Sequence, residues 1–293
     1  MILNEKCGKR LDQSLMEILQ ISRSKCQKMI ENESILVNGK KVRSSYLIKE
    51  NDEIEVLDYI EPVMDVTPEK MDLDIIYEDN DVLIVNKANG IVVHPGSGNY
   101  DHTLVNGLLY HSSSLSNTNG DFRPGIVHRI DAYTTGLLMV AKNNEAHEIL
   151  AKQLEQKTTT RKYIALVWGI INNDTGTIDA PIGRDKKDRK KMAVVEDGKK
   201  AVTHFRVLER FKEVTLIELS LETGRTHQIR VHMNYIDHPV VNDPVYGKRK
   251  KIDETGQCLH AKTLGFIHPR TAQYMEFDSD LPPYFTQFIE SLR

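Results

Sequence analysis

The chain has 293 residues, with 39 Lys and Arg against 42 Asp and Glu, and 40% of its residues are apolar. That apolar share is large enough to build a hydrophobic core, and the ordinary glycine and proline content excludes a collagen-like or wholly disordered chain. The net charge of −3 argues against a protein that coats nucleic acid without specificity, so any nucleic-acid contact must rely on local basic surfaces.

The sequence predicts neither a membrane span nor a secreted protein. No apolar run approaches the roughly 18 residues that a membrane-spanning helix needs, and the N-terminal segment Met1–Lys6 becomes charged at once. Cys7, Cys26 and Cys258 lie far apart and form no Cys-x-x-Cys pair, which predicts reduced thiols rather than a disulfide framework or a zinc site. We therefore expect a cytoplasmic protein.

Residues 1–62 are predicted to form a small ααβ unit. Apolar side chains at helical spacing indicate a first helix, and these are Leu11, Leu15, Ile18 and Leu19. A second helix is expected at 24–31 and strands at 34–39 and 53–57, with Asn38-Gly39 as a strong turn signal. Arg23, Lys25 and Lys28 can share one side of the second helix, although a charged helix face is usually only solvated.

A linker is predicted at 63–72, where prolines occur without hydrophobic periodicity, and a larger domain at 73–293. Strands and helices alternate there without βαβ regularity, so the fold class is α+β with a mixed or antiparallel sheet flanked by helices. The expected strands are 74–77, 82–85, 90–94, 162–168, 201–208 and 214–221, and the expected helices are 103–110 and 145–156.

Asp131 is the first candidate for catalysis. It lies in the stretch His128-Arg129-Ile130-Asp131, where a hydroxyl-rich turn precedes the apolar run 137–141. A side chain at such a turn can project from a rigid frame into a cleft. The alternative is structural, because an Asp before Thr134 and Thr135 often only caps a turn. The spacing does not fit a kinase catalytic loop, and no Gly-rich phosphate loop accompanies it.

A second dense stretch spans Leu221–Met233. Thr226 suits the N-cap of a helix, which would place Arg225 beside a helix N-terminus, a natural anion site, and Arg230 one turn into the helix. His227 and His232 are five residues apart rather than four and have no Glu-x-x-His companion. Metal binding is therefore not expected.

Tyr163 follows the basic pair Arg161-Lys162 in a predicted strand. A tyrosine there is usually packed in the core, yet an aromatic ring beside positive charge is also a surface on which a nucleobase stacks. Two loops, 183–191 and 248–251, are basic, which suits phosphates, although solvated loops explain them equally well.

Together these motifs resemble the RluA/RluD family of RNA pseudouridine synthases with an N-terminal S4-type RNA-binding domain. The S4-like signals run from Arg10-Leu-Asp12 to Val37-Asn-Gly39. The catalytic domain's signals are His128–Asp131 with Thr134–Leu138, Leu221–Met233, Asp243–Gly247 and Leu259–Ala261. The stretch Val92–Asn99 with Thr103–Asn106 looks most similar to the RluD branch, which modifies large-subunit ribosomal RNA.

The resemblance implies a cofactor-free, metal-free isomerase, acting on RNA as a monomer, in which Asp131 is the catalytic carboxylate. Tyr163 would stack on the flipped base and assist removal of the C5 proton. Arg230, rather than Arg225, would pair with Asp131, because it lies within the helix. RNA contacts are implied for Arg129, Arg225, Arg10, Arg23, Lys25 and Lys28.

Two rival functions follow from the same residues. One is a non-catalytic RNA-binding or ribosome-assembly protein, which would not need Asp131, Tyr163 and Arg230 together. The other is a glycosidase, which normally uses two carboxylates flanking the bond, whereas the sequence offers one well-placed Asp. Isomerisation of uridine, by contrast, needs an ionised carboxylate near the sugar and no redox chemistry.

Overall fold

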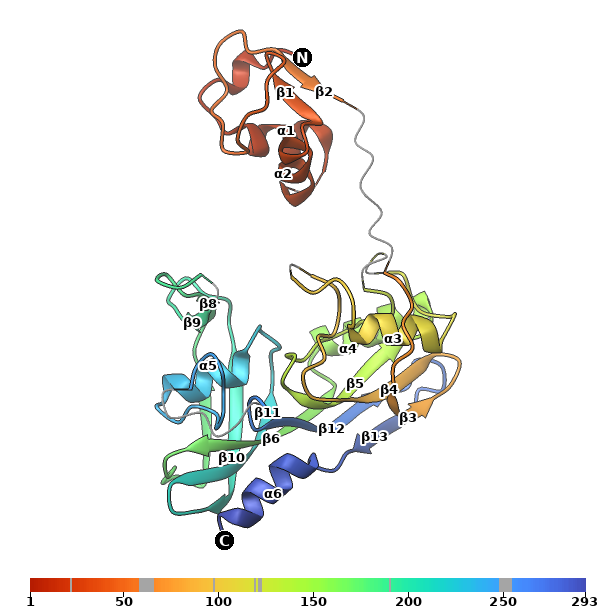
Figure 1. Cartoon of the computed structure of the whole chain (residues 1–293), viewed down its shortest axis with the longest axis vertical. Coiled ribbons are helices and arrows are strands. Elements are labelled where there is room, and N and C mark those ends of the chain that lie inside the picture. The colour runs from red at the N-terminus through yellow and green to blue at the C-terminus, as the bar shows by residue number, and fades with distance from the viewer. Residues whose placement is uncertain are drawn as a thin grey trace. The chain divides into compact units, whose positions relative to one another are not determined.

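The computed structural model describes residues 1–21, 23–57, 66–96, 98–118, 120, 123–189, 191–247 and 255–293. The chain divides into two compact units, Met1–Met64 and Asp65–Arg293, whose elements are labelled in Figure 1. Part of the linker expected at 63–72 and the basic loop at 248–251 lie outside the described residues. Within the described residues, no helix combines the length and apolar character needed to cross a bilayer.

The first unit has the expected ααβ composition. Its elements are η1 (Asn4–Lys6), α1 (Leu11–Leu19), α2 (Arg23–Glu31), β1 (Ile35–Val37) and β2 (Ile54–Val56). The predicted stripe of α1 does enter the core at Leu11 and Leu15, against α2 and both strands. Asn38 and Gly39 have φ angles of 52° and 68°, as a tight turn with two left-handed residues requires, but the strand that pairs with β1 is β2.

The second unit is built on one large sheet. Its strands are β3 (Asp74–Glu78), β4 (Val82–Lys87), β5 (Thr135–Ala141), β6 (Thr160–Trp168), β7 (Thr175–Asp179), β10 (Val202–Arg210), β11 (Val214–Leu221), β12 (Leu259–Ile267) and β13 (Tyr274–Asp278). They run in the order β3-β4-β5-β12-β6-β11-β10-β7, with β13 on β12. Every pairing is antiparallel except that of β5 with β12, so the α+β class with a mixed sheet is confirmed.

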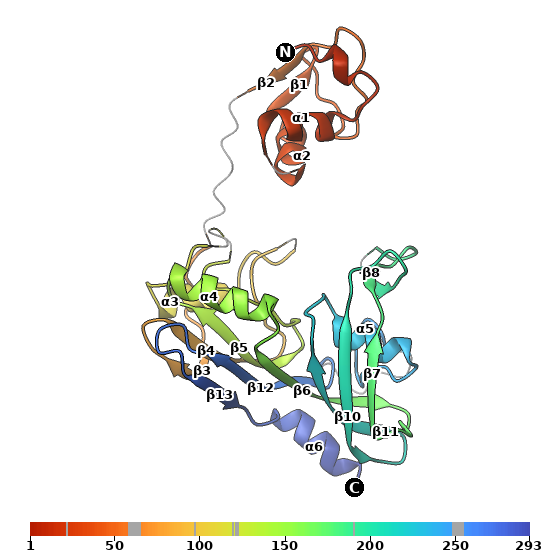
Figure 2. The same cartoon turned by 180° about the vertical axis from the view of Figure 1, so that it is seen from behind.

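Helices cover both faces of this sheet, because alternate residues of each strand point to opposite sides. The helices are α3 (Leu104–His111), α4 (Asn144–Glu155), α5 (Gln228–Tyr235) and α6 (Pro283–Ser291). Leu83 and Leu138 share a core with α3 and α5. Their strand neighbours Ile84 and Leu137 pack with α4. Farther along the sheet, α6 packs against β6. It lies on the face opposite to the one that α5 covers, and both helices are labelled in Figures 1 and 2.

The sequence analysis located most of these elements. The expected helices 103–110 and 145–156 correspond to α3 and α4, and the strand expected at 214–221 is β11. The prediction of a strand at 90–94 is wrong, because carbonyl groups of this segment accept hydrogen bonds from the first turn of α3. The carbonyl of Val92 accepts from the N–H of Leu104 at 2.8 Å, so this segment satisfies the first turn of α3 instead of joining the sheet.

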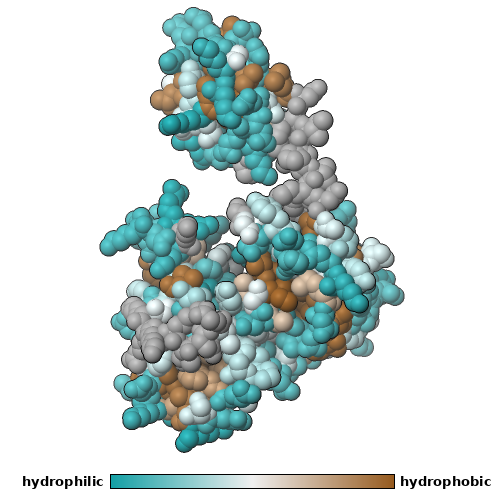
Figure 3. All heavy atoms as spheres, viewed as in Figure 1, coloured by the Kyte–Doolittle hydropathy of each residue, from teal (hydrophilic) through white to brown (hydrophobic). Residues whose placement is uncertain are grey.

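A separate two-stranded sheet carries one of the predicted basic loops. It consists of β8 (Ile182–Arg184) and β9 (Met192–Val194), and it projects from the main sheet in Figures 1 and 2. The loop between the strands exposes Lys186, Lys187 and Arg189, and Arg184 at the end of β8 is exposed as well. On the face drawn in Figure 3 this projection is mostly hydrophilic, as a solvated loop or a phosphate-binding loop requires.

Candidate active site

Asp131 lies in a turn that leads directly into β5. The N–H of Thr134 donates to the main-chain carbonyl of Asp131 at 3.1 Å, so the backbone closes the turn and leaves the carboxylate available. Two earlier residues of the motif anchor it. Ile130 is 7% exposed in the core, and the half-buried His128 ring accepts from the N–H of Met139 at 3.1 Å. Burial lowers the pKa of His128 to about 3, which keeps this imidazole neutral.

Gly136 fixes β5 against β12 close to this turn. It pairs with Ala261 in the parallel ladder and has a φ of 108°. A Cβ atom at this position would lie 2.3 Å from the carbonyl oxygen of Ala261. Both the backbone conformation and the close approach therefore require glycine, and they hold the Asp131 turn at the middle of the sheet.

Arg230 binds two carboxylates at once. Its Nη1 donates to Oδ2 of Asp131 at 2.8 Å, while Nε and Nη2 donate to the two oxygens of Asp243 at 2.7 and 2.8 Å. Arg230 is 4% exposed, so these charge-assisted bonds form away from bulk water. Burial opposes the charge of Arg230, but the two carboxylates outweigh it and hold the pKa of the guanidinium above its usual value.

The start of α5 differs from the expectation. Thr226 is not its N-cap, because the cap position is taken by His227, whose φ is 57°. The carbonyl oxygen of the Gln228 side chain accepts instead from the N–H of Arg225 at 3.0 Å and from the hydroxyl of Thr223 at 2.8 Å. Gln228, the first residue of α5, therefore holds the loop 223–225 that precedes the helix. His227 has a left-handed backbone, and its ring lies near Asp131.

Tyr163 approaches the same place from β6. It pairs with Leu219 on β11 and Ala261 on β12, and it is 7% exposed. Burial raises the pKa of its hydroxyl, as does the nearby Asp131, so the phenol is neutral at physiological pH. Its aromatic ring and the Asp131 carboxylate line one cavity.

The structure brings together the candidates of the larger domain. Asp131, Tyr163 and Arg230 share a cavity with the exposed Arg129 and Arg225. The Nε of Arg225 donates to the carbonyl of Lys200 at 2.9 Å, whereas the hydrogen bond to Asp131 comes from Arg230.

In the first unit, Asp12 organises two of the four basic candidates. Its fully buried carboxylate accepts from Arg10 at 2.9 Å and from Arg23 at 3.0 Å. Lys25 is half-buried and Lys28 is exposed. Hydrogen bonds from Arg10, above all, hold the pKa of Asp12 far below its usual value despite its burial. The two arginines are thus presented in fixed orientations.

Four residues near Asp131 were not assigned a role by the sequence analysis. Asp243 and His227 were named only as parts of motifs or as rejected metal ligands, and Tyr246 only as part of a motif. Lys87 carries no sequence signal for its position, since it ends the apolar run of β4 and yet is 1% exposed. Its Nζ donates to the carbonyl of Ala132 at 2.7 Å, beside Asp131.

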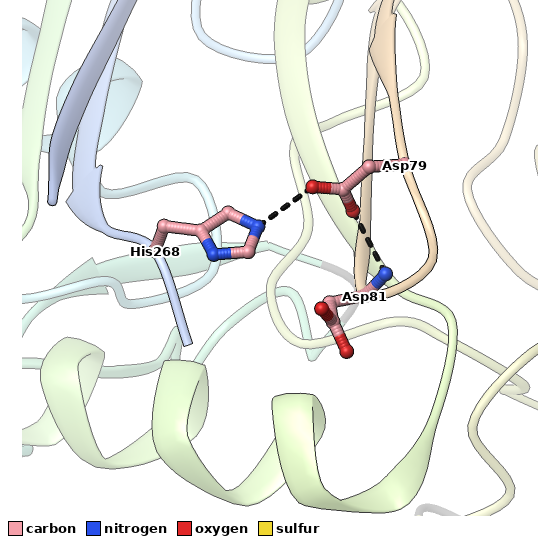
Figure 4. A group of neighbouring side chains, drawn as sticks. All are labelled: Asp79, Asp81 and His268. Carbon is pink, nitrogen blue, oxygen red and sulfur yellow. Dashed lines mark hydrogen bonds and ion pairs between the residues drawn. The ribbon is translucent and has the colours of Figure 1, made fainter. Parts of the chain in front are cut away.

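One group in the described residues has the composition of a metal site. The ligand atoms of Asp79, Asp81 and His268 lie within 4.8 Å of one another (Figure 4). The ring Nδ1 of His268 accepts from the N–H of Arg270 at 3.2 Å, so its Nε2 carries the proton and donates to Asp79 at 2.7 Å. Arg270 also binds both oxygens of Asp81 at 2.6 Å. The protein's own donors already occupy these groups, which tie two turns together.

Comparison with known proteins identifies the molecule. A family model described as RNA pseudouridylate synthase matches residues 81–235 of the 293, which include Asp131, Tyr163 and Arg230. The chain belongs to the RNA pseudouridine synthase family. Residues 9–54 of this pseudouridine synthase match an S4 domain, which contains Arg10, Arg23, Lys25 and Lys28. The family and its N-terminal S4 domain, expected from the sequence motifs, are thus confirmed.

Relatives of this pseudouridine synthase align over nearly their whole length. An uncharacterised RNA pseudouridine synthase of Bacillus subtilis is 58% identical over 93% of this chain and 90% of its own length. The ribosomal large subunit pseudouridine synthase D of Pseudomonas aeruginosa is 42% identical over 98% of this chain and 92% of its own. Among solved structures, human RNA pseudouridylate synthase domain containing 1 superposes with a TM-score of 0.61 at 27% identity, covering 75% of this chain and 94% of its own.

Proposed function

We propose that this pseudouridine synthase modifies uridines of large-subunit ribosomal RNA and that Asp131 is its catalytic carboxylate. The observation that carries the assignment of Asp131 is its hydrogen bond with Arg230, a buried cation that holds the carboxylate in place at the cavity. Asp131 is itself 18% exposed at its side chain and lines a cavity, so a substrate can reach it.

The two carboxylate oxygens of Asp131 have different surroundings. Oδ2 accepts from Arg230 at 2.8 Å, whereas Oδ1 lies 3.9 Å from Nε2 of His227, the one ion-pair contact of that oxygen among the described residues. We assign Oδ1 as the oxygen that faces the ribose. The reaction breaks the bond between N1 of uracil and C1′ of ribose, rotates the base and joins C5 to C1′. C5 then loses its proton and N1 gains one from solvent, so the product is an isomer of uridine. Asp131 can begin it by attack on C1′ or by removing a sugar proton, and both routes need the ionised form.

Tyr163 and Arg230 complete the proposed catalytic group. The Tyr163 ring, buried in the cavity wall, offers the flat surface on which a flipped base stacks, and stacking offsets part of the few kcal/mol lost on unstacking. Its hydroxyl would assist departure of the C5 proton. Arg230 is proposed to hold the Asp131 carboxylate in place through their hydrogen bond.

The substrate class rests on the relatives. Several sequences at 42–44% identity are named ribosomal large subunit pseudouridine synthase D. The S4 unit, with Arg10 and Arg23 fixed by Asp12, and the exposed Arg129 and Arg225 supply positive charge for an RNA backbone. We propose that the enzyme works in the cytoplasm, where ribosomes are made, as a monomer and without a metal ion.

The experiment is to incubate the purified enzyme with ribosomal RNA from cells that lack it, and to map new pseudouridines by carbodiimide modification and reverse transcription. Small-subunit RNA and transfer RNA serve as parallel substrates. New pseudouridines in large-subunit RNA alone are expected. New pseudouridines only in transfer RNA would overturn the substrate class, and retained RNA binding with no new pseudouridine in any RNA would favour a role as a ribosome-assembly factor.

A further inference from the structure

His227 lines the same cavity as Asp131 but is not part of the proposed catalytic group. Its Nε2 lies 3.9 Å from Oδ1 of Asp131, and the imidazole is 22% exposed. It lines both of the cavities that meet at Asp131. An atom of a bound nucleotide can therefore contact His227 and Asp131 together.

Hydrogen bonds determine which ring nitrogen of His227 carries the proton. Nδ1 lies 2.8 Å from the hydroxyl oxygen of Tyr246, and that oxygen already accepts from the N–H of Met192 at 3.0 Å. Among the described residues, Nδ1 is the acceptor within reach of the Tyr246 hydroxyl proton. Tyr246 therefore donates to Nδ1, which leaves the proton of the neutral ring on Nε2, the nitrogen that faces Asp131.

The backbone of His227 supports a functional role for this orientation. Its φ of 57° and ψ of 21° are left-handed, a conformation that costs a side chain other than glycine or asparagine free energy. The side chain does not cap the helix that begins next to it. Neither helix formation nor capping explains why a histidine is held there, whereas direction of Nε2 into the cavity does.

The surroundings of His227 make it a neutral hydrogen-bond donor to a bound base. Burial lowers the pKa of His227, so the ring is neutral; Asp131 and Asp243 act against that shift, while Arg230 and Arg129 reinforce it. The guanidinium of Arg230 is shared between two carboxylates. Uracil that departs with the N1–C1′ electron pair gains negative charge on its carbonyl oxygens, which an N–H donor stabilises.

We propose that His227, as its Nε2–H tautomer, donates a hydrogen bond to a carbonyl oxygen of the uracil ring during cleavage of the glycosidic bond, and that Tyr246 is the positioning residue that fixes this tautomer. The inference rests on the proposed role of Asp131, because the nucleotide must lie against that carboxylate. No proton is transferred in this step, so its chemical balance is that of the isomerisation itself.

Two substitutions separate this role from a structural one. The side-chain amide of His227→Gln reaches the position of Nε2, whereas that of His227→Asn reaches only the position of Nδ1, next to Tyr246. Asparagine also tolerates the left-handed backbone better than glutamine does. A structural role therefore predicts that Asn is the better replacement, and a role as donor predicts that Gln is.

The measurement is the single-turnover release of tritium from C5-tritiated uridine in large-subunit RNA, with RNA affinity measured in parallel. We expect His227→Asn to be slower by roughly 10- to 100-fold at unchanged affinity and His227→Gln to be within several-fold of the wild type. Tyr246→Phe should slow the wild type but not the His227→Asn variant. A wild-type rate for His227→Asn, an Asn rate equal to or above the Gln rate, or an equal effect of Tyr246→Phe in both backgrounds would overturn the inference.

Asp131→Asn in the same series separates the two proposals. If Asp131→Asn is inactive while His227→Asn is fully active, the role of His227 fails and that of Asp131 stands. If Asp131→Asn retains the wild-type rate, the proposed function of Asp131 fails, and the role of His227 beside it fails with it.

Discussion

Arg230 contacts Asp131 through a single nitrogen, Nη1, at 2.8 Å, and uses its other two nitrogens for Asp243. The Asp243 carboxylate is fully buried and also accepts from the N–H groups of Val245 and Tyr246. Arg230 is therefore fixed from the side away from the cavity. Its position relative to Asp131 depends on a carboxylate that does not line the cavity shared by Asp131 and Tyr163.

Asp243→Asn is expected to impair turnover without changing RNA affinity. The new amide would place an N–H group against a donor nitrogen of Arg230, so the guanidinium would lose its bidentate partner and shift from Asp131. We expect a fall in kcat of roughly 10- to 100-fold, from the loss of a charge-assisted hydrogen bond. Asp280→Asn, at an exposed carboxylate, is the matched control. Unchanged kcat in Asp243→Asn would contradict the positioning role.

Lys87 should make stability depend on pH in an unusual direction. Burial lowers its pKa to about 7 from 10.5, although the nearby Asp131 acts to raise it. Between these values the unfolded chain binds more protons than the folded chain, so the contribution of Lys87 to the free energy of unfolding rises with pH and is constant below about 7. The neutral amine can still donate to the carbonyls of Ala88 and Ala132.

Denaturant unfolding of the wild type and Lys87→Met, between pH 6 and pH 9, tests this sign. The single tryptophan, Trp168, lies in β6, so its fluorescence reports on the larger unit. The stability of the wild type relative to Lys87→Met should increase above about pH 7, by about 1 kcal/mol or more per pH unit. A relative stability that stays constant from pH 6 to pH 9 would show that Lys87 stays charged when folded and would contradict this prediction.

Gly136→Ala should destabilise the larger unit strongly. The added methyl group would meet the Ala261 carbonyl oxygen at 2.3 Å, and the φ of 108° is unfavourable for any other residue. We expect a loss of about 3 kcal/mol or more, measured by Trp168 fluorescence in denaturant. Gly96→Ala, where an added Cβ atom meets nothing within 4 Å and φ is not positive, is the control. Equal stabilities of the two variants would contradict the close approach of β5 and β12.

Asp12→Asn should weaken the capture of RNA rather than the chemistry. Asp12 orients Arg10 and Arg23, whose side chains are 37% and 47% exposed, and a neutral amide cannot bind both guanidinium groups. We expect KM for RNA to rise by roughly tenfold, as for the loss of one or two phosphate contacts, with kcat at saturating RNA unchanged. Glu33→Gln removes an exposed acid of the same unit and should leave KM as it is. A fall in kcat at unchanged KM would contradict this role.

Local sequence patterns were enough to predict many of the helices and strands. The apolar segment Val214–Leu221 was predicted as a strand and forms β11, and the apolar stripe of 145–156 predicted the helix α4. The segment 90–94 has the same apolar character, but the needs of the first turn of α3 determined its structure. A strand and a helix N-terminus compete here for the same backbone carbonyl groups. The outcome depends on tertiary contacts, which a single sequence does not show.

The candidate site was only partly predictable for a related reason. Asp131 and Arg230 stand out because their motifs place charged residues at turns and helix starts. Lys87, Asp243 and Tyr246 reach the site through contacts across 45, 13 and 19 residues of sequence. The cap of α5 was missed because Thr226 is the better capping residue by composition, whereas the contacts of His227 and Gln228 hold the loop.

The most direct test of the central claim is tritium release from C5-tritiated uridine in large-subunit ribosomal RNA by the wild type and by Asp131→Asn. The substitution keeps the size of the side chain and removes its charge, so RNA binding, measured alongside, should persist. Release by the wild type and none by Asp131→Asn is the expected result. Release at the wild-type rate by Asp131→Asn would contradict the assignment of Asp131 as the catalytic carboxylate.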